Sequence, residues 1–218
     1  MRDRPAALAL ALALAGVLVL APASPAVEPK QPATPEEIIA YHDSGEWAAD
    51  TTAVVDKARA YLESHLAPRA AIVLDVDDTS LSSYDCLRRT DFDRKALGQA
   101  CVEDAEMPAI PQTLGLFDFA RSKGVSVFFI TGRRARQRSA TISNLRAQGY
   151  RGTWSLTMRP NRQPRSQRSG WKARVRRTLV KRGYRIVVNV GDQYSDLRGG
   201  SALKTFKLPN PMYTIPVA

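Results

Sequence analysis

An α/β domain built on a doubly wound parallel sheet is the fold class that this sequence predicts. Short apolar runs alternate with helical patterns along the chain, and three of those runs end directly in polar residues that can carry chemistry. Strands that alternate with helices favour a parallel sheet with helices on both faces. The length of 218 residues and the hydrophobic content of 44% suffice for one well-cored domain, but hardly for two large ones.

Each element is predicted by its own pattern. The first helix begins where Thr34, Pro35 and Glu37 supply an N-cap, a proline at the first helical position and an acid at the third. Residues 80–109 show no clean period and are rich in charge, so we expect a small insert, or cap, folded over the strand ends. The other expected elements are helices over 35–45, 50–65, 111–123, 135–148 and 170–182, and strands over 71–75, 125–130, 153–157, 184–190 and 203–208.

The first 26 residues have the pattern of an export signal. Arg2 and Arg4 make a basic start, residues 6–21 are apolar, and small residues at 21–23 and 24–26 offer two cleavage sites. An uncleaved membrane anchor is the alternative, although this apolar run is short for a span. We therefore expect a signal peptide over 1–26, one domain over 27–218, and a secreted mature protein with no stable membrane association.

Two cysteines, Cys86 and Cys101, are the only ones in the sequence. An oxidising compartment would favour a bridge between them, and closing that loop would contribute about 3 kcal/mol. Two buried free thiols are the alternative. A metal site built from thiols and imidazoles is disfavoured, because the sequence adds only His42 and His65 to this pair.

The chain is strongly basic, with a formal net charge of +11. Removing residues 1–26 takes away two arginines and one aspartate, which leaves +10. Residues 159–185 hold eleven Lys or Arg and no acid, and nucleic acid is the obvious alternative partner for such a block. Few aromatic residues interleave with these charges, so we expect a solvated helix face and loop that attract phosphate, with no specific nucleic-acid partner.

Two carboxylates follow the first strand. Asp75 is the first polar residue after an apolar run and Asp77 lies on the same side, since side chains alternate along extended chain. Close carboxylates repel each other, bind a divalent metal, or divide into a nucleophile and an acid/base group. An ordinary acidic turn is the structural alternative.

Further polar residues stand at the ends of later strands. Thr131 and Gly132 follow the second strand and offer a hydroxyl and a glycine turn for phosphate oxygens, with simple helix capping as the alternative. Asp192 and Asp196 follow the fourth strand and suggest hard oxygen ligands for Mg²⁺, with a solvated turn as the alternative. Lys172 could balance these acids, although without context it would be an exposed helix lysine.

Together these segments resemble the haloacid dehalogenase (HAD) superfamily, and most closely its secreted acid phosphatases of the class B/C and plant-type branch, subfamily IIIB. The elements that carry the resemblance stand in the family's order along the chain. They are D75-V-D77-D-T79, T131-G-R133, Lys172 and G191-D192-x-x-x-D196. The resemblance implies a Rossmann-like sheet with a cap after its first strand.

The resemblance also implies a role for each site residue. Asp75 would attack phosphorus, and Asp77 would protonate the leaving alcohol and then activate water. Thr131, Gly132 and Lys172 would hold the phosphoryl oxygens. Mg²⁺ would be held by Asp75, the backbone carbonyl of Asp77 and Asp192, with Asp196 either as a further ligand or as a support for the ligands.

The predicted function is a secreted, Mg²⁺-dependent acid phosphatase that hydrolyses small phosphomonoesters such as nucleotides. A dehalogenase needs no acid at position 77, and a P-type pump needs a lysine at position 76, where this chain has Val76. A non-catalytic phosphate-binding or storage protein on the same fold is the alternative. A nucleic-acid-binding module is a second one, and it predicts strongly salt-dependent DNA binding.

Overall fold

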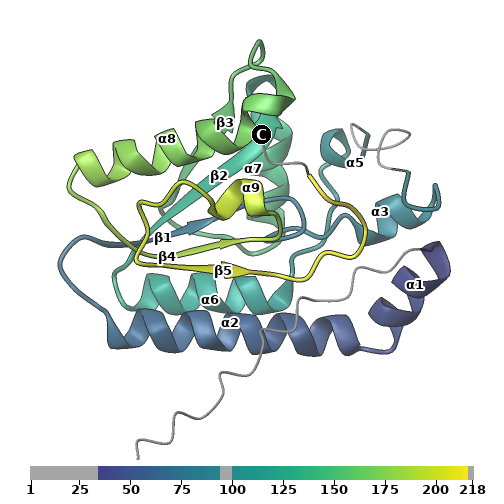
Figure 1. Ribbon diagram of the computed structural model, residues 1–218, viewed down its shortest axis with the longest axis horizontal. Coiled ribbons are helices and arrows are strands. Elements are labelled where there is room, and N and C mark those ends of the chain that lie inside the picture. The colour runs from purple at the N-terminus through teal and green to yellow at the C-terminus, as the bar shows by residue number, and fades with distance from the viewer. Residues whose placement is uncertain (1–33, 94–99, 216–218) are drawn as a thin grey trace, which may run out of the picture.

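The computed structural model describes residues 34–93 and 100–215. It contains one five-stranded sheet in the order β3-β2-β1-β4-β5, with every neighbouring pair parallel. The strands are β1 (Ala70–Leu74), β2 (Ser126–Arg134), β3 (Ser155–Arg159), β4 (Arg185–Gly191) and β5 (Lys204–Lys207). The predicted doubly wound α/β fold is therefore confirmed, and all strands end at the same edge of the sheet (Figure 1).

Helices cover both faces of the sheet, as Figure 1 shows for α8 (Arg168–Lys181) on one side and α2 (Glu46–Ser64) with α6 (Pro111–Ser122) on the other. The side chains of β1 divide between these faces. Ile72 and Leu74 belong to the large core under α2 and α6, whereas Ala71 and Val73 pack with residues of α8. Because β1 is buried on both faces, the chain after it is held rigidly at the centre of the sheet.

The N-terminal helices follow their sequence signals. In α1 (Pro35–Asp43), Thr34 and Glu37 form the predicted capping box: each side chain accepts a hydrogen bond from the other's backbone N–H. The second helix begins at Glu46, four residues earlier than expected. Gly45 allows this early start, because its positive φ of 84° lets the chain turn directly from one helix into the next.

The second strand differs from its prediction. It does not end at Ile130 but continues through Thr131 and Gly132 to Arg134. The register with β3 shifts between Thr131 and Arg134, so the expected glycine turn is instead an irregular strand end. A single 3₁₀ turn (Ala135–Gln137) then leads into α7 (Arg138–Ala147).

The two ends of the insert over 80–109 pair with each other. Ser82 N–H donates to the carbonyl of Pro108 at 2.8 Å, and a β-bridge pairs Leu81 with Ala109. A disulfide joins Cys86 on α3 (Tyr84–Arg88) to Cys101 on α5 (Ala100–Glu103), with the Cα atoms 5.9 Å apart. Bridging thus prevails over two free thiols, and it ties the two ends of the insert together.

The predicted signal segment over 1–26 lies outside the described residues. Within the ranges that the structure describes, no helix is both long and apolar enough to cross a membrane.

Candidate active site

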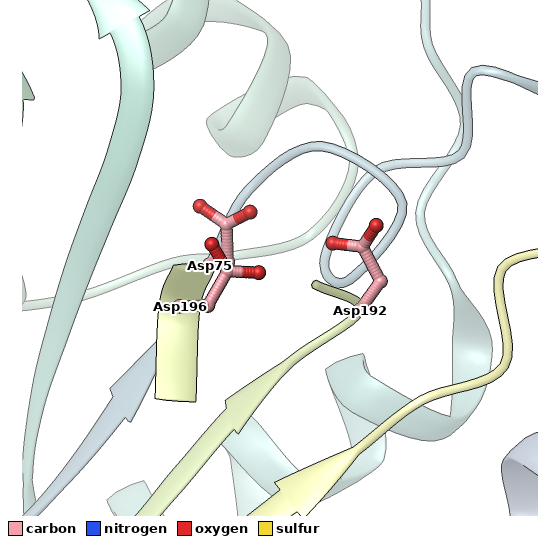
Figure 2. A group of neighbouring side chains, drawn as sticks. All are labelled: Asp75, Asp192 and Asp196. Carbon is pink, nitrogen blue, oxygen red and sulfur yellow. The ribbon is translucent and has the colours of Figure 1, made fainter. Parts of the chain in front are cut away.

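Three aspartates meet beyond the ends of β1 and β4 (Figure 2). Asp75 follows β1, Asp192 follows β4, and Asp196 lies on the one-turn helix α9 (Tyr194–Leu197). One oxygen from each carboxylate lies within 4.8 Å of the others, and all three residues are buried. The sheet order explains the meeting, because β1 and β4 are neighbours although more than a hundred residues separate them.

Gly191 allows Asp196 to fold back over the end of β4. A Cβ atom at Gly191 would lie 2.5 Å from the Cβ of Asp196, closer than side chains approach each other. The Oδ2 atom of Asp196 also accepts a hydrogen bond from the backbone N–H of Gln193 at 2.9 Å, which caps α9. Glycine is therefore required where the sequence has it.

Lys172, on α8, contacts this group of aspartates. Its Nζ atom donates to Oδ1 of Asp75 at 2.6 Å and to Oδ1 of Asp196 at 2.7 Å. Lys172 is 2% exposed, so the context-free expectation of an exposed helix lysine is wrong. Burial lowers the pKa of Lys172, but the charges of Asp196 and Asp75 raise it by more, so the amine is a cation.

The acids are held in an electrostatically costly arrangement. Burial, followed by the charge of Asp196, raises the pKa of Asp75 to about 7. Burial likewise raises the pKa of Asp192 well above its ordinary range, with Asp196 and Asp75 adding repulsion. If all three carboxylates are ionised, the single ammonium group of Lys172 leaves two negative charges uncompensated. This deficit and the hard oxygen donors fit a divalent cation.

Asp77 stands apart from the three clustered carboxylates and is the more accessible acid. Its side chain is 22% exposed, and its Oδ1 atom accepts from Nε of Arg133 at 3.0 Å and from a terminal guanidinium nitrogen at 2.9 Å. Arg133 is buried, and a hydrogen bond to the Thr141 hydroxyl fixes its position. Asp77 is thus oriented by a fixed cation, two residues beyond Asp75.

Asp78 and Thr79 shape the turn between the acids. Asp78 has a positive φ of 53° and accepts hydrogen bonds from the backbone N–H and hydroxyl of Ser83. The Thr79 hydroxyl donates to Oδ1 of Asp192 at 3.1 Å, which links the turn after β1 to the end of β4. Both residues therefore hold the turn that follows Asp75 in a fixed shape.

Thr131 and Gly132 lie on β2, the neighbour of β1 in the sheet. The Thr131 hydroxyl is fully buried and accepts from the backbone N–H of Arg133 at 3.1 Å. The Gly132 carbonyl accepts from Nε of Arg159 at 3.0 Å. The fold therefore brings Asp75, Asp192 and Asp196 within 4.8 Å of one another, with Lys172 bonded to Asp75 and Asp196. It sets the Thr131-Gly132 segment on the adjacent strand.

Two supporting residues escaped the sequence reasoning. Arg176, one turn after Lys172, is 1% exposed and donates to the backbone carbonyls of Asp196, Leu197, Arg198 and Gly200 at the end of α9. Asn210 donates from Nδ2 to Oδ2 of Asp192 at 2.7 Å. No local signal marks either residue: one stands within an arginine-rich run and the other between two prolines.

Known proteins resemble this chain along most of its length. Acid phosphatase 1 of Solanum lycopersicum is 35% identical over 154 residues, which are 66% of this chain and 58% of the tomato protein. The stem 28 kDa glycoprotein of Glycine max is 31% identical over 83% of this chain and 76% of its own length. Vegetative storage protein 1 of Arabidopsis thaliana is 34% identical over 66% of this chain, and the match spans 55% of that protein.

The fold has a solved counterpart as well. The class C acid phosphatase from Bacillus anthracis superposes with a TM-score of 0.66 and 25% identity, over 82% of this chain and 84% of that one. The family model described as HAD superfamily, subfamily IIIB (acid phosphatase) matches residues 13–216. This match extends through all five strands and every residue of the site. The chain therefore belongs to subfamily IIIB of the HAD superfamily, the acid phosphatases.

Proposed function

We propose that this protein is a metal-dependent acid phosphatase that hydrolyses small phosphomonoesters, nucleotides among them, through an aspartyl-phosphate on Asp75. The observation that carries the proposal is the buried group of three carboxylates and one lysine beside an accessible, arginine-bound Asp77. In this arrangement Asp75 can attack phosphorus, while Asp77 can transfer protons.

In the first half of the reaction, a carboxylate oxygen of Asp75 forms a bond to phosphorus as the bond to the leaving alcohol breaks. Asp77 gives its proton to the departing oxygen, and Arg133 holds that carboxyl group in place. In the second half, Asp77 takes a proton from water, and the water oxygen attacks phosphorus. The bond from phosphorus to Asp75 then breaks, which frees phosphate and restores the carboxylate.

The phosphoryl oxygens of a bound substrate need hydrogen-bond donors inside the site. The Lys172 ammonium, the Thr131 hydroxyl and the Gly132 N–H are the groups we assign to them. Asp75, Asp192 and Asp196 would hold Mg²⁺, together with the backbone carbonyl of Asp77. When bound, the ion supplies charge that screens the nucleophile from phosphate and stabilises the transferring group.

The basic segment over 159–185 favours a small anionic substrate over a nucleic-acid partner. Three of its cations, Arg159, Lys172 and Arg176, are buried and bonded inside the domain, so they cannot face a polymer. The remaining positive charges would attract an anionic phosphomonoester to the strand ends. We further propose that the protein is exported by its N-terminal signal, which sequencing the N-terminus of the mature protein would test.

Hydrolysis of p-nitrophenyl phosphate and of AMP tests the proposal, with Mg²⁺ or with EDTA. We expect Asp75→Asn and EDTA each to abolish turnover, and Asp77→Asn to lower kcat by a factor of about 100 or more. Asp118→Asn, an exposed acid on α6, is the matched control and should keep wild-type turnover. Equal turnover by wild type and Asp75→Asn would refute the mechanism, and an inactive wild type would favour a storage role.

A further inference from the structure

The segment after β5 returns to the acidic cluster. The parallel register pairs Gly191 with Lys207, so the residues that follow Lys207 run beside Asp192. Leu208 N–H donates to the carbonyl of Gly191 at 2.9 Å, which extends this pairing by one residue. Two positions later, the buried Asn210 reaches the carboxylate of Asp192 with its side-chain amide.

The carboxylate of Asp192 is held from three directions. Its Oδ1 atom accepts from the Thr79 hydroxyl at 3.1 Å. Its Oδ2 atom accepts from Nε2 of Gln193 and from Nδ2 of Asn210, each at 2.7 Å. The two amide donors occupy both lone-pair sites of Oδ2 and fix the plane of the carboxylate, and that plane decides where the remaining lone pair of Oδ1 points.

The orientation of Asn210 is itself determined by its neighbours. Its Oδ1 atom accepts from the backbone N–H groups of Met212 at 2.9 Å and Tyr213 at 3.3 Å. A flipped amide would turn NH₂ toward these two donors and an oxygen toward the carboxylate, which would lose every favourable contact. The turn over 210–213 therefore forces the NH₂ group to face Asp192.

The same segment is anchored on both sides. Gln193 accepts the backbone N–H of Ile215 with Oε1 at 2.8 Å and donates from Nε2 to the carbonyl of Tyr213 at 3.2 Å. The Tyr213 hydroxyl donates to Asp78, and Trp47 Nε1 donates to the carbonyl of Pro209 at 3.1 Å. The segment over 208–215 thus joins the turn after β1, the end of β4 and the N-terminal helices.

We infer that Asn210 is a positioning residue for Asp192, and that the segment over 208–215 is part of the active site. This inference rests on the proposed function, because it assigns Asn210 to the residue that we expect to bind the metal. Partners that orient a metal ligand typically change metal affinity by 10- to 100-fold when they are removed. The amide acts on binding through Asp192 and touches no substrate atom.

Binding of Mn²⁺, measured by electron paramagnetic resonance of the free ion, tests the inference on the full-length mature protein. We expect Asn210→Ala to weaken Mn²⁺ binding by about 10- to 100-fold. Asn210→Ser serves if the alanine variant does not fold, because a hydroxyl can still accept the Met212 N–H but is too short to reach Asp192 as well. Raising the Mn²⁺ concentration should restore turnover of p-nitrophenyl phosphate by either variant.

Trp47→Phe is the matched control, since it removes the hydrogen bond to Pro209 next to Asn210 without touching Asp192. Its Mn²⁺ affinity should stay within about twofold of wild type, well under the change that loss of a ligand-orienting partner causes. Wild-type affinity in the Asn210 variants would overturn the inference while the proposed function stands. An equal loss in Trp47→Phe would also overturn it, because anchoring of the segment would then be the cause. A wild type that binds no Mn²⁺ would refute the metal site itself.

Discussion

Replacing the proposed nucleophile should make the metal-free protein more stable. Asp75 is 7% exposed, and burial together with the charge of Asp196 raises its pKa from 3.8 to about 7. Above both values, the charged form costs the folded state about 1.36 kcal/mol for each pKa unit between them, which gives about 4 kcal/mol. Asp75→Asn keeps the shape of the side chain and removes this cost.

The sign of the effect depends on pH. The folded chain keeps the Asp75 proton up to about pH 7, whereas the unfolded chain releases it near pH 4, so wild-type stability falls as the pH rises between these values. The amide of Asp75→Asn does not titrate. The variant should therefore exceed wild type by up to about 4 kcal/mol at pH 7.5 and match it at pH 4.

Thermal unfolding in EDTA measures this difference. For a domain of this size, 1 kcal/mol changes Tm by about 2–4 °C, so Asp75→Asn should unfold up to about 8–16 °C above wild type at pH 7.5. Asp118→Asn, exposed on α6, should unfold with wild type at both pH values. A variant that is less stable than wild type at pH 7.5, or a difference that persists at pH 4, would refute the reasoning.

Three further predictions follow from single contacts. Gly191→Ala should weaken Mn²⁺ binding at least tenfold, because the new Cβ would displace Asp196. Gly115→Ala on α6 is the control: its new Cβ would have no neighbour within 4 Å, so Mn²⁺ binding should stay unchanged in the same titration. Arg133→Lys should lower kcat for p-nitrophenyl phosphate about tenfold with little change in KM, since a single amine cannot reproduce the two contacts to Asp77; unchanged kcat would contradict this role. Reduction of the disulfide should lower the free energy of unfolding by about 3 kcal/mol, and equal melting of oxidised and reduced protein would contradict that estimate.

The sequence was sufficient to predict the sheet and the acids at its edge. Apolar runs that end in charge are local features, and parallel strands bring such ends to one edge of the sheet. That Asp75 and Asp192 lie side by side depends on the adjacency of β1 and β4, which only the structure shows. The burial of Lys172 could not be predicted in this way. The depth of Lys172 depends on how α8 packs against the sheet, and the same helix also carries the exposed Arg174 and Arg177.

Contacts between side chains that are far apart in the sequence were still harder to predict. The bond between Arg133 and Asp77 spans 56 residues, and the bond between Asn210 and Asp192 depends on the register of β5. The prediction that β2 would end at Ile130 was wrong because the strand continues irregularly through Thr131 and Gly132. Periodicity does not report such strand ends, since they are set by the neighbouring strand.

The course of the chain after β5 matters for anyone who shortens this protein. A truncation placed after Lys207 would keep every helix and strand that the structure describes. It would nonetheless remove Asn210, whose amide donates a hydrogen bond to Asp192, and Tyr213, whose hydroxyl donates to Asp78. Asp192 and Asp78 would each lose a hydrogen-bond donor that no described element of the sheet or its helices replaces, so the end of the domain has to be set by these contacts and not by the last strand.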